Sequence, residues 1–221
     1  MSLNGSDHEA TPPVRPKALK ELLGRRRILV FLTVFLVELA IFFFATSMPI
    51  NATTQQGLQQ EARNLSGATS GMGPADLFAY ILTHNAAIAF GEMIPILGGF
   101  LWVVSIYATG QVIQVVAISN GAPGALYGLL LLFFPFTLVE LSAYTVAVAS
   151  GIMLIVSWRR HTLSFEVRVL VLEACLVAAL LSCAAAMETV TIVNPILGLA
   201  LWIPVGVTIA GLILVSRGAR S

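Results

Sequence analysis

Residues 28–48 read ILVFLTVFLVELAIFFFATSM, and Glu38 is the one charged residue among them. About 20 such residues are enough to cross the hydrocarbon core of a bilayer as a helix. The segment is longer than the apolar region of a signal peptide, and no Ala-x-Ala cleavage site follows it. These residues therefore predict a first membrane span that stays part of the chain.

The whole chain has the composition of a membrane protein. Its 221 residues are 57% hydrophobic and 10% charged, whereas a soluble domain carries about 25% charged residues. The same figures exclude a disordered chain. The net charge of +1 gives no basic excess that would point to nucleic acid. We therefore expect a chain whose main partner is the lipid bilayer, with no nucleic-acid partner.

Further apolar segments follow the first one and predict an all-α, polytopic transmembrane bundle of about six spans. One transmembrane domain would cover residues 28–216, between a polar, basic tail at 1–27 and a short tail at 217–221. Pro135 interrupts a long apolar run and predicts a kinked or broken helix. The polar residues 49–74 predict an outer loop, and Glu188–Thr191 a short turn. The spans expected after the first are 75–91, 96–119, 136–158, 169–187 and 192–215.

The positions of the basic residues predict the orientation of the bundle. With six spans, all 12 Lys and Arg residues except Arg63 lie on one side, and the positive-inside rule makes that side cytoplasmic. If residues 75–91 are instead re-entrant, five spans remain and the loop at 159–168 moves outside with its arginines. We favour six spans in the cell membrane, with both termini cytoplasmic. The outer loop then carries two sequons, at Asn51 and Asn64, which chance in a segment rich in Asn, Ser and Thr explains equally well.

Ionisable residues at membrane depth identify the candidate site, because each costs at least about 2.5 kcal/mol to insert. Glu38 is central in the first span, His84 and Asn85 are central in the second, and Glu140 lies about one turn after Pro135. These four residues form a candidate intramembrane polar cluster, in which His84 would partner a carboxylate. Structural hydrogen bonds between helices would account for them as well.

A second set of polar residues has a weaker claim to function. Glu92 and Glu188 are expected near span ends, where both can reach the interface. Gln111 and Gln114 share one helix face, which suits interhelical hydrogen bonds better than a polar path. Glu173 is expected to pair with Arg168 or to extend towards the interface.

Recognisable catalytic and cofactor motifs do not occur in the sequence. There is no phosphate-binding loop, no His-Glu-x-x-His and no Gly-x-Ser-x-Gly. The three histidines are too far apart in sequence to indicate a metal site. We therefore expect a protein that is not an enzyme and that uses neither a metal nor another cofactor.

Taken in order, the polar and turn residues resemble the stage II sporulation protein M family over about residues 77–190. The resemblance rests on five features: His84-Asn85, the glycines at 91, 98 and 99, Asn120-Gly121, residues 135–140 (PFTLVE) and residues 184–188 (AAAME). Phe136-Thr137 stands where the family often has His-Gly, and His84 replaces the first residue of an Asn-Asn pair. The resemblance implies a membrane scaffold, or a partner subunit of a membrane-associated complex.

Three hypotheses of function remain. The first is a non-enzymatic membrane subunit that organises protein partners in the membrane, and a homo-oligomer is also compatible with it. The second is a small transporter or channel with a polar path through Glu38, His84, Asn85 and Glu140. The third, with least support, is an intramembrane enzyme that uses a Glu/His pair as acid and base.

Overall fold

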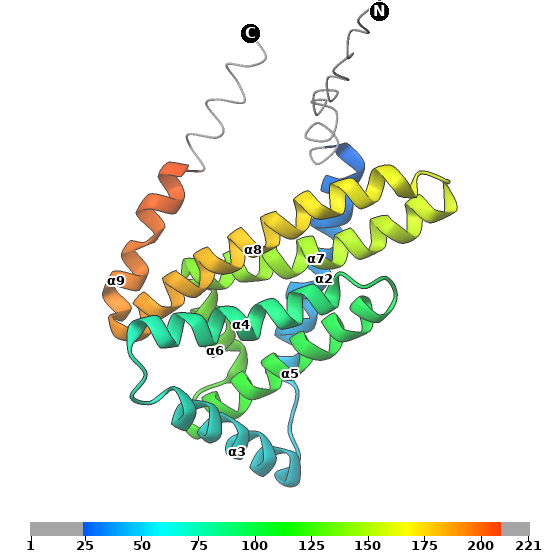
Figure 1. The fold of residues 1–221 in the computed structure, drawn as a ribbon. Helices are drawn as coiled ribbons and strands as arrows, with labels where there is room; N and C mark the ends of the chain where they lie inside the picture. Colours follow the sequence, from blue (N-terminus) through cyan, green and yellow to red (C-terminus); the bar gives the residue numbers. More distant parts are fainter. Residues whose placement is uncertain (1–23, 209–221) are drawn as a thin grey trace, which may run out of the picture.

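The computed structural model describes residues 24–208, and every regular element in that range is a helix (Figure 1). Most of the predicted basic tail and all of the predicted C-terminal tail lie outside the described residues. The helices are α2 (Arg25–Ser47), α3 (Ala52–Thr69), α4 (Pro74–Glu92), α5 (Leu97–Ser119), α6 (Gly124–Leu132), α7 (Pro135–Arg159), α8 (Leu163–Val193) and α9 (Pro195–Ala200), and a further helical turn region follows at 202–208.

Within residues 24–208, four helices are long and apolar enough to cross a membrane: α2, α5, α7 and α8. Large apolar side chains on their outer faces, such as Leu36 and Phe100, are exposed in the isolated chain, as expected for surfaces that contact lipid. The helix α4 corresponds to the expected span at 75–91 but is less apolar than these four. The expected span at 192–215 extends beyond the described residues, so the count of six spans stays a prediction.

The polar residues expected to form a loop at 49–74 contain the helix α3. Asn51 caps this helix, since its side-chain oxygen accepts a hydrogen bond from the Thr54 backbone N–H at 2.9 Å. Gln, Glu, Ala and Arg, which favour helices, make up much of the segment. The helix buries none of its residues. The expectation of a loop was wrong because polarity reports exposure to water and not the absence of a helix.

The turn expected at Glu188–Thr191 is also wrong, because α8 continues through these residues to Val193. The break comes at Asn194, whose extended backbone is the conformation favoured before a proline. Its side-chain oxygen accepts from the backbone N–H groups of Ile196 and Leu197, both at 3.2 Å, and so caps α9. Glu188 therefore lies within α8, before its last turn.

The chain also changes direction between α6 and α7. The helix α6 ends at Leu132, and Pro135 is the first residue of α7, a position where its missing N–H leaves no unpaired donor. The Thr137 hydroxyl donates to the Leu131 carbonyl at 2.8 Å and ties the two helices together.

Packed groups of buried side chains hold the bundle together, and two of them each join three helices. The first joins α4, α7 and α8, which lie side by side (Figure 1), through Ala89, Ala143, Ala147, Val177 and Leu181 with Met93 beside them. Small residues on α7 allow this close approach, since Ala143 and Ala147 are fully buried. The second group joins α2, α5 and α7 through Val34, Phe42, Trp102, Ile106 and Val148.

Candidate functional site

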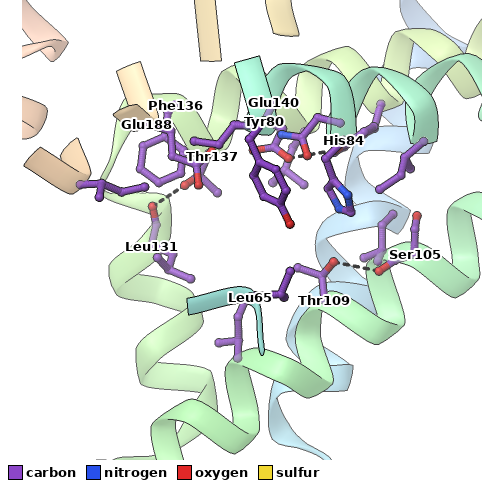
Figure 2. Close-up of a pocket in the computed structure, with 18 of the residues that line it drawn as sticks. Leu65, Tyr80, His84, Ser105, Thr109, Leu131, Phe136, Thr137, Glu140 and Glu188 are labelled. Atoms are coloured by element: carbon purple, nitrogen blue, oxygen red, sulfur yellow. Dashed lines mark hydrogen bonds between the residues drawn. The ribbon is translucent and has the colours of Figure 1, made fainter. Parts of the chain in front are cut away.

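A cavity of about 450 Å³ lies among the helices, with walls from α2 to α8 (Figure 2). The helix α3 closes one side of it with Leu65, Ser66 and Thr69. Much of the wall is apolar. Its polar side chains are Ser66, Thr69, Tyr80, His84, Asn85, Ser105, Thr109, Thr137, Glu140, Tyr144 and Glu188.

The structure brings three residues of the predicted cluster to this cavity: His84, Asn85 and Glu140. Glu188, which was expected at the end of a span, joins them because α8 continues past it. Glu38 does not line the cavity. Asn85 is buried, whereas the His84 side chain is exposed towards the open space in Figure 2.

Glu140 and Glu188 form the acidic side of the cavity. One oxygen of Glu140 accepts a hydrogen bond from the Tyr144 hydroxyl at 2.9 Å, one helical turn further along α7. Glu188 on α8 lines the same cavity as Glu140. Two acidic groups on neighbouring helices therefore face the same space.

His84 does not have the carboxylate partner that the sequence analysis expected. Among the hydrogen bonds and ion pairs of residues 24–208, none joins His84 to an acidic side chain. Its ring instead stacks on that of Tyr80, with 6.5 Å between the centroids and 10° between the planes. The stacking follows from the i, i+4 spacing of the two residues on α4. It holds both rings at the cavity (Figure 2).

Two further carboxyl groups are buried in the bundle outside the cavity wall. Glu38 is fully buried and accepts a hydrogen bond from the Thr145 hydroxyl of α7. Glu92 is 1% exposed and accepts from the Ser105 hydroxyl at 2.9 Å. Because Ser105 lines the cavity, Glu92 lies directly behind its wall. The second oxygen of each carboxyl group has no hydrogen-bond partner within the described part of the chain.

The expectation that Glu92 reaches the interface was wrong. The turn from α4 to α5 folds tightly over it, so a Cβ atom on Gly98 would overlap the Glu92 carbonyl oxygen. Ile96 has a φ of 70° in this turn, a left-handed conformation that is costly for a β-branched residue. The close return of α5 seals Glu92 inside the bundle.

Gln111 and Gln114 bind the end of α2. The Gln111 side-chain amide donates to the Ala45 carbonyl at 3.1 Å, and that of Gln114 to the Met48 carbonyl at 3.5 Å. Neither lines the cavity. Their role in the structure is the interhelical hydrogen bonding that the sequence favoured, here to backbone carbonyls.

A separate ionic cluster joins the start of α2 to α8. Arg27 is 9% exposed and forms ion pairs with both Glu166 and Glu173. The expected pairing of Glu173 with Arg168 was therefore wrong, since Arg168 points outward on α8. The contact to Arg27 depends on how two helices far apart in sequence are packed.

Sequence reasoning missed the tyrosines of the cavity. Tyr80 stacks on His84 and Tyr144 donates to Glu140. A signal was available, because each tyrosine lies four residues from its partner on the same helix. Within residues 24–208, no three His, Cys, Asp or Glu side chains come together as metal ligands.

The fold and the cavity define a class of protein: an all-helical membrane protein with a largely apolar cavity between its helices, lined by two acidic side chains. The chain belongs to the stage II sporulation protein M family, whose model matches residues 28–191. This range includes α2 from Ile28 onward and every cavity residue except Ile192. No curated protein and no solved structure matches the chain significantly.

Proposed function

We propose that this protein is a non-enzymatic, multi-pass subunit that organises protein partners in the cell membrane. Family membership and the apolar helices support a membrane protein. The observation that supports a role in binding partners is the exposure of the helix α3. A helix of 18 residues that buries none of them adds little to the stability of the bundle, so its polar side chains are available to another protein.

The surface of α3 suits a partner outside the membrane. Its exposed residues include Gln56, Gln60, Glu61 and Asn64, which offer hydrogen-bond donors and acceptors with little net charge. The helix is attached to the bundle along α5, where Gln59 donates to Ser119 at 3.3 Å. In this proposal α3 lies on the outer side and both termini are cytoplasmic.

Cysteine labelling in intact cells tests this orientation. In a chain whose two native cysteines are replaced by alanine, Gly67→Cys on α3 should react with a membrane-impermeant maleimide. A Cβ atom on Gly67 has open space around it, so the substitution leaves the helix intact. Ser164→Cys, exposed at the start of α8, should react only after permeabilisation. The reverse pattern would overturn the orientation.

Site-specific crosslinking tests the partner role. A photoreactive amino acid at Gln56, on the exposed face of α3, should give one reproducible adduct with a protein partner in cells. The same amino acid at Ser164 is the matched control at an exposed position on the other side. Equal adducts from both positions, or a protein that elutes alone in several mild detergents without an adduct, would contradict the proposal.

The cavity favours a second candidate function, a path for protons or a small solute. Acidic side chains at membrane depth are typical of such paths, and Glu140, Glu188 and His84 share one cavity. Proteoliposomes containing the purified protein should then show a proton or solute flux that Glu140→Gln and His84→Ala reduce. Absence of flux with the unmodified protein would refute this candidate and leave the first one standing.

A further inference from the structure

The carboxylic acid side chains of the cavity wall have no lysine or arginine side chain beside them in the described part of the chain. Glu140 and Glu188 line the cavity, whereas no lysine or arginine of residues 24–208 does. Glu92 lies behind the Ser105 wall, and Glu38 is buried against Thr145 outside the wall. The ion pairs within residues 24–208 are those of Arg27 with Glu166 and Glu173, so none of these four acidic groups has a basic partner there.

Uncompensated acidic groups in a membrane protein favour a cation in the space between them. A carboxylate removed from water loses its hydration, and an opposite charge in direct contact restores much of that loss. Glu38 and Glu92 are buried outside the cavity wall, so the acidic groups that a bound cation would contact are Glu140 and Glu188. A cation bound between Glu140 and Glu188 would favour the ionised forms of these two groups.

The rest of the wall indicates what kind of cation fits. Aromatic rings of Phe42, Tyr80, Phe136 and Tyr144 face the cavity among leucines and isoleucines. Such rings bind organic ammonium groups through their negative faces and pack against hydrocarbon. The volume of about 450 Å³ lies within the range of small-molecule sites.

We propose that this cavity binds a small organic cation, with its ammonium group between Glu140 and Glu188 and its hydrocarbon part against Tyr80 and Phe136. These residues come from α4, α7 and α8, so the bound cation joins three helices of the bundle (Figure 2). Binding here needs no protein partner and no flux across the membrane. The inference therefore holds or fails independently of both candidate functions.

Calorimetry on the full chain in detergent tests the proposal with three probes of equal carbon skeleton: n-butylammonium, n-butanol and butanoate. The unmodified protein should bind n-butylammonium at least tenfold more tightly than n-butanol, with no binding of butanoate. Tetraethylammonium should compete with n-butylammonium. Equal affinities for the cation and the alcohol, or no binding of either cation, would overturn the proposal without the use of any variant.

Three variants then locate the site. Glu140→Gln and Glu188→Gln should each weaken n-butylammonium binding at least tenfold, and the double variant should bind n-butylammonium no more tightly than n-butanol. Glu61→Gln, on the exposed surface of α3, is the matched control and should stay within twofold of the unmodified protein. Elution as a single species in size-exclusion chromatography confirms that each variant is folded. A folded double variant with unchanged affinity would place the cation elsewhere and refute the site.

Discussion

Replacing Arg27 by methionine should remove a large part of the stability of the bundle. Arg27 forms ion pairs with Glu166 and Glu173, and the side chains of the three residues are 10%, 6% and 9% exposed. Methionine retains much of the apolar stem but leaves two buried carboxyl groups without a cation. Breaking a buried pair by removal of one partner costs about 3–5 kcal/mol, which is roughly a 10²- to 10³-fold change or more in the unfolding equilibrium.

Reversible unfolding in mixed micelles, followed by far-UV circular dichroism, measures this loss. Arg26→Met is the matched control, because Arg26 is exposed at the adjacent position and surface charges contribute about 0–1 kcal/mol. Adding Glu166→Gln and Glu173→Gln to Arg27→Met should recover most of the stability, since no buried charge then remains unpaired. A loss for Arg27→Met within about 1 kcal/mol of the control would refute the reasoning.

Two further predictions concern helix contacts. Gly110→Ala should destabilise the protein by about 1–3 kcal/mol, because the added Cβ would lie 2.5 Å from the Ala45 Cβ on α2. Gly99→Ala on the same helix meets nothing within 4 Å and should lack that packing cost in the same unfolding measurement; equal losses would contradict the packing argument. Asn51→Ala should weaken α3 by about 1 kcal/mol through loss of its N-cap, visible as faster amide hydrogen exchange over residues 52–56. Thr53→Ala removes the same sequon but keeps the cap, so faster exchange in that variant as well would assign the effect to the sequon.

Hydropathy was sufficient to predict the main helices but not their ends. The apolar runs that predicted the first, third and fourth spans correspond to α2, α5 and α7. The predictions of a loop at 49–74 and of a turn at 188–191 were wrong for a common reason. Polar residues reduce hydropathy without stopping a helix, and only capping and proline geometry ends one. Asn194 followed by Pro195 was the signal for the end of α8.

The membrane-depth argument selected residues of the cavity but could not arrange them. His84, Asn85 and Glu140 share the cavity because depth along the membrane follows from sequence position. The rotation of each helix about its axis does not follow from it, since the helices are apolar nearly all round. For this reason Glu38 faces Thr145 and not the cavity, and Glu173 faces Arg27 and not Arg168.

The contact between Arg27 and its two acidic partners also sets an order of events during synthesis. Arg27 precedes Glu166 by 139 residues and Glu173 by 146. Ribosomes add about 5–20 residues per second, so the two acidic partners are synthesised roughly 7–30 s after the arginine. Until then Arg27 lacks both of the acidic partners that it has in the folded chain. The ion pairs between the start of α2 and α8 can therefore form only after the contacts of α2 with α5 and α7 have become available.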